Sequence, residues 1–292
     1  MSACVCGSSM RIDSHQHFWR YRTEDHPWMS AEMAALRRDW LPADLRPLLD
    51  AHGFQRCIAV QARSSAAETD FLLELADEHS WIAGVVGWVD LRADGLPQRL
   101  ELWRGAAPLV GFRHQVQDEP DPAALLANAR FRRGVAELHK NLLVYEVLVH
   151  ARQLAAVPDF CAACDRHWIV LDHLGKPAIR HRDHQTWRRE LLPLSGMSHV
   201  VCKLSGLVTE AMNEAGGFDR EELTRYLDTA LELFGAERLM FGSDWPVCLL
   251  AASYAEVVEI IERWAERLSV SERESLWGET ARRTYAGCDR WI

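Results

Sequence analysis

The sequence predicts a single (β/α)8 barrel, and three observations lead to that prediction. The chain has 292 residues, of which 48% are hydrophobic and 26% charged, the composition of an ordinary globular protein. Eight short apolar runs rich in β-branched residues recur about 25 to 45 residues apart, which leaves room for a helix between neighbours. Polar side chains gather at the carboxyl ends of these runs, where the active sites of such barrels lie.

The expected strands follow one another without a linker or a change in composition. In chain order they are 11–17, 57–62, 82–90, 109–115, 143–150, 168–175, 200–206 and 239–245. We expect residues 1–10 to be a disordered tail, because the strand pattern begins only after Met10. Residues 11–292 are then expected to form one domain.

Helices are predicted in the intervals, among them 42–52, 67–78, 159–168 and 220–234. Gly53 and Gly235 follow two of them, as glycine commonly does at the end of a helix. Ser271 and Glu274 are expected to form a capping box at the start of the last helix. Segment 18–40 is too long for a simple loop, and we interpret it as a lid or a pocket wall.

The net charge of −9, spread without runs of like charge, disfavours nucleic acid as a partner. The longest apolar stretches, such as 81–89, are too short to span a membrane. The first ten residues lack the pattern of a secretory signal. We therefore expect a cytoplasmic protein that acts on a small molecule, and the sequence leaves open whether it is a monomer or a homodimer.

Two histidines at the end of the first strand are the first functional candidates. Strict alternation would place Asp13, His15 and His17 on one face, which we expect to point into the barrel. Two neutral imidazoles at this spacing can bind one divalent cation. The same pattern also occurs without a role, so the motif alone leaves both interpretations open.

Asp244 ends an apolar strand at the expected mouth of the barrel. Burying a carboxylate there without a cation or hydrogen-bond partners would be costly, which favours a metal site, although Asp244 could instead cap the next helix. His173 follows the sixth strand and by itself could be an ordinary core residue. Together with His15 and His17, it is interpreted as a ligand or an acid.

Cations are also expected inside the barrel. In the run VVCKLSG, apolar residues alternate with Lys203 and Ser205, so that these two face inward. Arg113 ends the fourth strand in a similar position. Arg113 and Lys203 could contact substrate, or they could form internal ion pairs with Asp90 or Glu146, and both alternatives stay open.

Several longer segments resemble one known group of enzymes. They are RIDSHQHFW, GFRHQVQDEP, VLDHLGKP, VCKLSGL, FGSDWPV and WGETARRTYAG. The chain resembles the amidohydrolase superfamily over about 11–287, and within it the sugar-lactone hydrolases of the L-fuconolactonase and L-rhamnonolactonase type. This resemblance implies a metal site made by HxH after strand one, histidines after strands five and six, and an aspartate after strand eight.

Residue by residue, the resemblance implies that His15, His17 and Asp244 bind a divalent metal ion such as zinc. Asp244 would also be the general base, and His173 the histidine of strand six. No lysine suited to bridging two metals follows strand four or five, so the resemblance implies one metal ion or none. Some lactonases of this group work without a tightly held metal, which keeps metal-independent catalysis open.

The fifth strand does not fit this pattern unambiguously. Glu146 and His150 share a face but stand roughly 13 Å apart, so only one can reach the level of the metal. Glu146 matches an acidic residue usual in the lactonases, whereas His150 would satisfy the wider superfamily pattern. The sequence does not decide between them.

The resemblance implies hydrolysis of a sugar lactone to its aldonic acid. A neutral substrate covered with hydroxyl groups suits a pocket of aromatic and hydrogen-bonding side chains. We expect that pocket to contain Trp19, Trp28, Gln61, Trp88, Arg113, Gln115 and Lys203. The alternative is a decarboxylase of the same superfamily, which would need two or more inward cations, and Arg63, Arg113, Lys176 and Lys203 could supply them. A third hypothesis is a non-catalytic binding protein, but this hypothesis leaves the carboxylate of Asp244 unexplained.

Overall fold

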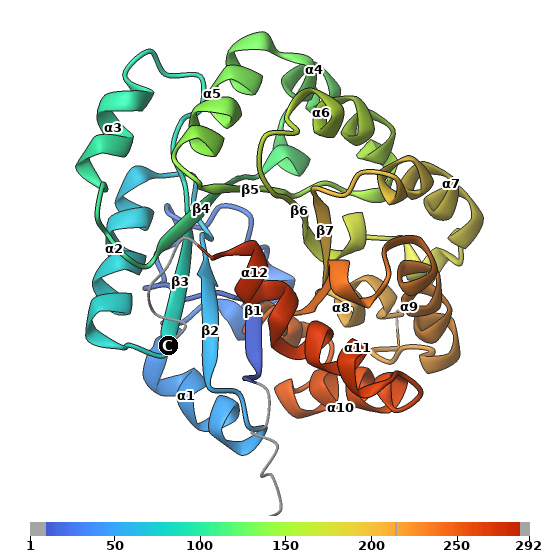
Figure 1. The fold of residues 1–292 in the computed structure, drawn as a ribbon. Helices are drawn as coiled ribbons and strands as arrows, with labels where there is room; N and C mark the ends of the chain where they lie inside the picture. Colours follow the sequence, from blue (N-terminus) through green and yellow to red (C-terminus); the bar gives the residue numbers. More distant parts are fainter. Residues whose placement is uncertain (1–9, 214, 287–292) are drawn as a thin grey trace, which may run out of the picture.

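Eight parallel strands form one barrel, as the sequence predicts. The structure is a computed structural model and describes residues 10–213 and 215–286. The strands are β1 (Ile12–Gln16), β2 (Arg56–Val60), β3 (Ile82–Gly87), β4 (Leu109–His114), β5 (Val144–Val147), β6 (Ile169–Leu171), β7 (Val200–Leu204) and β8 (Leu239–Phe241). They lie in chain order, and a parallel bridge between Gln16 and Trp245 joins the last strand to the first. The helices surround the strands (Figure 1).

Helices occupy every interval between strands. They are α1 (Pro42–Ala51), α2 (Ala66–Glu78), α3 (Leu96–Leu102), α4 (Pro122–Ala127), α5 (Ala129–Lys140), α6 (Val157–Ala163), α7 (His184–Ser195), α8 (Leu207–Ala211), α9 (Arg220–Phe234), α10 (Tyr254–Ala265), α11 (Val270–Glu274) and α12 (Thr280–Thr284). Apart from Met10, the tail predicted at 1–10 lies outside the described residues. The extension of the domain to residue 292 likewise stays a prediction.

Two helix boundaries predicted from the sequence are wrong. The helix expected at 159–168 ends at Ala163, because the chain must turn before it enters β6. The last capping box is formed by Ser269 and Glu272, whose side chains each accept the other's backbone N–H, and not by Ser271 with Glu274. The segment SVSERE contains the same spacing twice, two residues apart, so the pattern alone could not choose.

The inside of the barrel is filled by apolar side chains, most of them β-branched. These are Ile12, Ile58, Val60, Val86, Val110, Val144, Val170, Val201 and Met240. Ala281 and Tyr285 join this layer from the carboxyl-terminal helix, which crosses the end of the barrel where the strands begin (Figure 1). That end is therefore closed by packing, and only the opposite end can admit a ligand.

The expectation that Asp13 faces the interior with the two histidines is wrong. Ile12 belongs to the interior layer, and the pairing of β1 with β2 shifts register between Asp13 and Gln16. The Asp13 carboxylate turns instead toward α10, where it accepts a hydrogen bond from Tyr254 Oη at 3.2 Å. Such an irregularity changes the face that the following residues present, and so His15 reaches the interior while Asp13 does not.

The alternation predicted for the seventh strand is confirmed. Val201 lies in the interior layer and Lys203 follows on the same face, whereas Cys202 and Leu204 belong to the outer core beneath the helices. Strands five and seven thus both send a charged residue inward, since Glu146 bonds with Lys203 inside the barrel.

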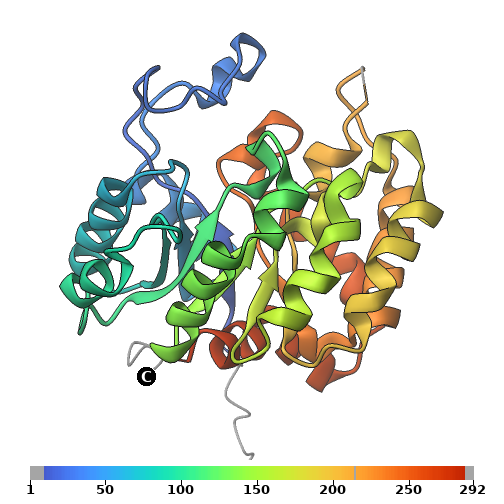
Figure 2. The ribbon, with the colours of Figure 1, turned by 90° about the horizontal axis from the view of Figure 1, so that it is seen from above.

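Segment 18–40 forms a structure of its own at the open end. Its ends are joined by two backbone hydrogen bonds of 3.0 Å between Trp19 and Trp40. In Figure 2 it is the blue segment at the top, which stands clear of the surrounding helices. Trp28, in its middle, lines the cavity described below, which confirms the interpretation of this segment as a pocket wall.

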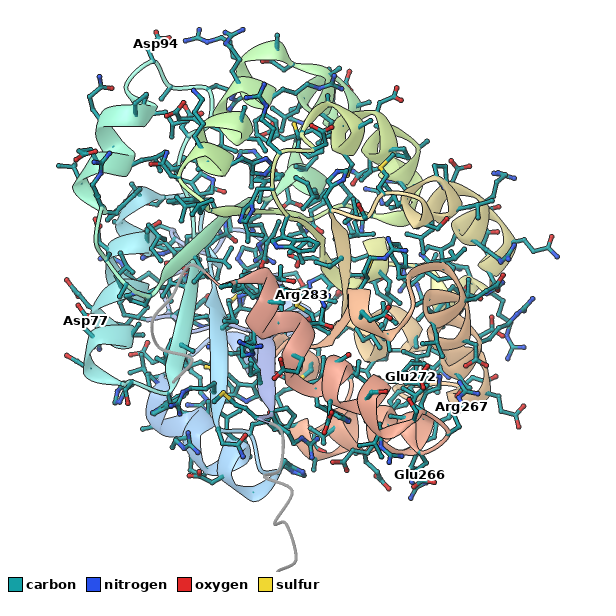
Figure 3. All side chains as sticks on the ribbon, viewed as in Figure 1. Asp77, Asp94, Glu266, Arg267, Glu272 and Arg283 are labelled. Atoms are coloured by element: carbon teal, nitrogen blue, oxygen red, sulfur yellow. The ribbon has the colours of Figure 1, made fainter. Side chains whose placement is uncertain are left out.

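The outer surface is charged. Figure 3 shows Asp77, Asp94 and Glu266 pointing away from the barrel, and all three are exposed. Within the described residues, none of the helices is both long and apolar enough to cross a membrane.

Candidate active site

The open end of the barrel brings together three histidines and an aspartate. The His15 ring lies 4.9 Å from the His17 ring and 4.5 Å from the His173 ring, between centroids. Asp244 Oδ1 lies 3.4 Å from His17 Nε2 and 3.7 Å from His15 Nε2. The structure thus assembles the four residues that the sequence analysis singled out.

The protonation of His17 follows from one hydrogen bond. Its Nδ1 lies 2.7 Å from the carbonyl oxygen of Val60, which can only accept a hydrogen bond. Nδ1 therefore carries a proton, and Nε2 is the ring atom that lies toward Asp244. This is the arrangement that a metal-binding histidine requires.

His15 lies deeper and contacts several charged groups. Its Nδ1 lies 3.1 Å from Lys203 Nζ and 3.4 Å from Asp172 Oδ1. Burial and the charge of Lys203 hold the pKa of His15 well below its ordinary value, so the ring is neutral. A metal ion bound at Nε2 requires the ring proton on Nδ1, where Asp172 Oδ1 is the acceptor, since the Lys203 ammonium can only donate.

The loop after β8 places Asp244 beside these rings. Its backbone N–H donates to the His15 carbonyl oxygen at 2.8 Å, which ties the loop to β1. Burial alone would raise the pKa of Asp244, but His173, His17 and His15 more than offset it and hold that pKa below its ordinary value. The carboxylate is therefore ionised at neutral pH.

His173 lies in a tight turn after β6 and is buried. Burial lowers its pKa to about 4, so the ring is neutral at physiological pH. Its Nδ1 lies 2.8 Å from Ser205 Oγ, which fixes the orientation of the ring. A neutral imidazole can bind a metal or donate one hydrogen bond, but it is not a cationic acid.

Among the residues described, two groups could hold a metal ion. In each, three possible ligand atoms lie within 4.8 Å of one another, and all the residues are buried. The first group, His15, His17 and Asp244, is the set implied by the sequence resemblance. The second, His15, Asp172 and His173, contains a residue that the sequence analysis missed. Asp172 stands directly before His173 in the chain, and that adjacency was the available signal.

Neither candidate on the fifth strand belongs to these two groups. Glu146 lies below the histidines, where its Oε1 accepts hydrogen bonds from Lys203 at 2.7 Å and from Tyr285. His150 follows the end of the strand and does not line the cavity. Neither Glu146 nor His150 therefore belongs to a candidate metal site among the described residues.

Arg113 and Lys203 take part in internal ion pairs. Lys203 Nζ is fully buried between Glu146 and Asp172, as one of the two alternatives anticipated. Arg113 pairs with Asp172 at 2.9 Å, rather than with Asp90 or Glu146. Its remaining nitrogen atoms donate to Gln61, including the backbone carbonyl oxygen. Together these pairs hold Asp172 ionised, because Lys203, His15 and Arg113 outweigh its burial and keep its pKa well below the ordinary value.

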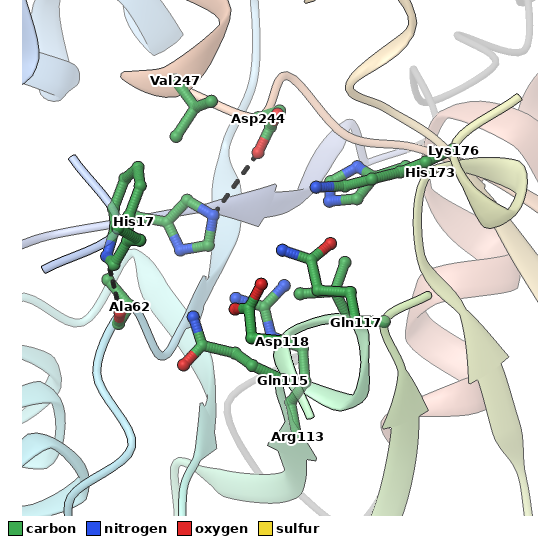
Figure 4. A pocket seen from close by; sticks show the side chains of 12 residues that line it. His17, Ala62, Arg113, Gln115, Gln117, Asp118, His173, Lys176, Asp244 and Val247 are labelled. Atoms are coloured by element: carbon green, nitrogen blue, oxygen red, sulfur yellow. Dashed lines mark hydrogen bonds and ion pairs between the residues drawn. The ribbon is translucent and has the colours of Figure 1, made fainter. Parts of the chain in front are cut away.

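A cavity with about 490 Å³ of empty space, part of it open to solvent, is lined by His17, His173 and Asp244 (Figure 4). Of the residues predicted to contact substrate, Trp28, Arg113 and Gln115 line it, whereas Trp19, Gln61, Trp88 and Lys203 do not. The sequence analysis did not anticipate five further lining residues, which are Ala62, Gln117, Asp118, Leu148 and Val247. It noted Lys176 only as a cation that a decarboxylase could use, and this residue lines the same wall as His173.

The comparisons with known proteins agree with this geometry. The sequence model of the family described as Amidohydrolase matches residues 12–287, which is nearly the whole of the described chain. The chain belongs to the amidohydrolase family. The crystal structure of an amidohydrolase from Burkholderia multivorans with bound Zn has the same fold, with a TM-score of 0.92 and 56% sequence identity. The match covers 95% of this chain and 99% of that one.

Two curated relatives of this amidohydrolase have a named activity. A protein of Burkholderia multivorans (strain ATCC 17616 / 249) named L-fucono-1,5-lactonase is 56% identical over 95% of this chain and 96% of its own. A second L-fucono-1,5-lactonase, from Burkholderia ambifaria, is 34% identical over 85% of this chain and 84% of its own. The similarity therefore extends over the whole barrel, including every strand that contributes to the site.

Proposed function

We propose that this amidohydrolase hydrolyses a sugar lactone, of the L-fucono-1,5-lactone kind, to the aldonic acid. The observation that carries the proposal is an ionised carboxylate, Asp244, that lines a polar cavity beside His17 and His173. The two lactonase relatives, at 56% and 34% identity, support the same reaction. The decarboxylase alternative has less support, since neither of these relatives is named as one.

The donor set fits a single divalent cation. His15, His17 and Asp244 offer two imidazole nitrogen atoms and a carboxylate oxygen, a combination typical of zinc. We therefore propose that these three residues hold one zinc ion, as the related crystal structure contains Zn. When bound, the ion would polarise the lactone carbonyl and make a neighbouring water more acidic, which compensates for the weak basicity of Asp244.

Asp244 is placed to move the proton of the reaction. Its carboxylate accepts a proton from a water molecule in the cavity as that water attacks the lactone carbonyl carbon. When the ring C–O bond breaks, the same carboxyl group returns the proton to the departing ring oxygen. His17 keeps the carboxylate oriented, because its Nε2 lies 3.4 Å from Oδ1.

The cavity suits a neutral ligand with many hydroxyl groups. Gln115, Gln117 and Asp118 supply donors and acceptors on one side, and Trp28 and Leu148 supply apolar contact. Figure 4 shows the amides of Gln115 and Gln117 facing the space in front of His17. The cytoplasmic location, the oligomeric state and the lack of a nucleic-acid partner stay predictions from the sequence.

A panel of five- and six-membered sugar lactones tests the proposal. Acid release is followed in a weakly buffered solution, and the spontaneous opening of each lactone is subtracted. We expect catalysed release from L-fucono-1,5-lactone and slower release from its stereoisomers. If no lactone is opened faster than the blank, while an aromatic carboxylic acid loses carbon dioxide, the chain is a decarboxylase and the proposal is wrong.

A further inference from the structure

The turn that follows β6 has an unusual backbone. Four consecutive residues have positive φ: His173 at 54°, Leu174 at 52°, Gly175 at 70° and Lys176 at 47°. Only glycine adopts this left-handed region freely, and the other three residues are strained there. Strain of this kind persists only where the surroundings impose it, and it is concentrated at functional sites.

The surroundings of this turn do impose it. Trp187 Nε1 donates to the Leu174 carbonyl oxygen at 2.8 Å, and the Ala151 N–H donates to the Lys176 carbonyl oxygen at 3.3 Å. Gly175 is packed so closely that a Cβ atom there would lie 2.5 Å from Leu154 Cδ2. The turn is therefore held from two separate elements, α7 and the short 3-10 helix Ala151–Ala156.

The result of the turn is that two side chains reach the cavity from one wall. The Lys176 N–H donates to the His173 carbonyl oxygen at 2.9 Å, so the two residues are one tight turn apart. Both line the cavity, and Figure 4 shows them pointing into it from the same side. A strained turn that delivers His173 and Lys176 together indicates that both are used.

The two cations that line the cavity differ in what they bind. The nitrogen atoms of Arg113 already donate to Asp172 and Gln61, which are both buried. For the Lys176 ammonium, by contrast, no hydrogen bond or ion pair is found within the described parts of the chain. Lys176 is half-buried, so its three N–H groups remain available to a ligand.

We propose that Lys176 is a catalytic residue whose ammonium stabilises the oxyanion of the lactone. The inference rests on the proposed function. As the water oxygen bonds to the carbonyl carbon and gives its proton to Asp244, the π electrons of the C=O bond move onto the carbonyl oxygen. Lys176 donates a hydrogen bond to that oxygen, where the negative charge develops. The C=O bond then re-forms, the ring C–O bond breaks, and its electrons take the proton back from Asp244.

One other role for Lys176 has to be distinguished from this one. Glu210 carries a raised pKa because of its burial, and the charges of Lys176 and Arg180 act against that rise. Lys176 could therefore serve only as a distant charge partner of Glu210. If so, the charge of Glu210 would itself be needed for activity, and Glu210→Gln would lose as much activity as Lys176→Met.

The test compares four proteins on L-fucono-1,5-lactone: wild type, Lys176→Met, Lys176→Arg and Glu210→Gln. We expect Lys176→Met to lower kcat about 100-fold, the usual cost of losing one oxyanion donor, with little change in KM. Lys176→Arg should recover part of that loss because it keeps a cation in place. Glu210→Gln should retain at least half of the wild-type kcat. The thermal unfolding midpoint of each variant shows that it is folded, and Lys176→Gln replaces the Met variant if that one is not.

Each other outcome overturns a definite part of the account. If Lys176→Met keeps more than half of kcat, or if Glu210→Gln falls as far as Lys176→Met, Lys176 does not act on the substrate, although the enzyme remains a lactonase. If wild type opens no sugar lactone, the proposed function fails, and this inference fails with it.

Discussion

Gly206 shows how closely the side chains of the candidate site are packed against the backbone. It follows β7 with φ at +64°, and a Cβ atom there would lie 2.7 Å from His173 Nδ1 and 3.3 Å from Asp244 Oδ2. No side chain fits at this position without moving His173. Position 206 therefore requires glycine because the His173 ring occupies the space that a Cβ atom would need.

Gly206→Ala is therefore expected to damage catalysis more than folding. Displacing His173 by about an ångström should lower kcat/KM about 10- to 100-fold. The loss of stability should be about 1 kcal/mol, the ordinary cost of alanine in the left-handed region. Gly53→Ala is the matched control, since Gly53 has φ +69° and nothing within 4 Å of the added atom. Steady-state kinetics and urea unfolding of both variants check this, and equal kinetics for the two would contradict it.

Lys203 is the second residue with a definite expected effect. It is fully buried with Glu146 and Asp172, so Lys203→Met leaves a buried carboxylate without its partner. The free energy of unfolding should fall by about 3–5 kcal/mol. Replacing both members, as Lys203→Met with Glu146→Leu, should recover much of the loss. Lys140→Met, which removes an exposed pair with Glu137, is the control and should cost less than about 1 kcal/mol.

Sequence reasoning identified four residues that the structure brings together, but not the residues that hold them in place. His15, His17, His173 and Asp244 could be predicted because polar residues at the ends of apolar strands stand out. Asp13 was placed on the wrong face, because a break in strand register leaves no trace in an alternating pattern. The ion pair of Arg113 with Asp172 could not be predicted either, because it depends on which side chains two separate strands direct toward the axis of the barrel.

The last turn of helix α5 contains a buried histidine, His139, which should make the free energy of unfolding depend on pH in the acid range. Both ring nitrogen atoms of His139 are buried without a hydrogen-bond partner in the described chain. Burial, with the neighbouring His167 and His199, lowers the pKa of His139 to about 4. The unfolded chain, with a histidine pKa near 6.5, therefore binds a proton between these two values that the folded chain does not.

Stability should accordingly fall as the pH drops from about 6.5 towards 4. His139 should lower the free energy of unfolding by up to roughly 3 kcal/mol at the acid end of this window and have no such effect above pH 6.5. In His139→Phe, the difference between the unfolding free energies at pH 5 and pH 7 should shrink, as measured by urea unfolding. His181→Gln, at an exposed position, is the control. An unchanged difference in His139→Phe would show that this histidine is protonated in the folded protein.

Element boundaries were predicted well where a terminating residue was present and poorly elsewhere. Gly235 directly follows α9, and Gly53 stands two residues beyond the end of α1. The expected strands 82–90 and 168–175 run too far, because their last residues leave the sheet to form the mouth of the barrel. Hydrophobicity continues into those loops since they remain buried, and a pattern of burial cannot report the loss of strand hydrogen bonds.

For the whole molecule, one topology explains why the active site lies where it does. The carboxyl-terminal helix closes one end of the barrel through Tyr285, so the buried polar residues of the interior face the other end. The barrel could be predicted from eight repeated strand and helix intervals. The turn at 173–176 could not be predicted. Its left-handed backbone is imposed by contacts with Trp187, Ala151 and Leu154, which lie in other elements of the chain.

Asp244 is proposed as the base of the lactonase reaction, and the substitution Asp244→Asn removes that function. The amide keeps the size and a hydrogen-bonding oxygen of the carboxylate but cannot accept the proton of the attacking water. Opening of L-fucono-1,5-lactone is measured for wild type and variant by acid release at neutral pH, with the spontaneous rate subtracted. We predict that kcat/KM of the variant falls at least about 100-fold, with the unfolding midpoint little changed. A folded Asp244→Asn variant that keeps most of the wild-type rate would contradict the account.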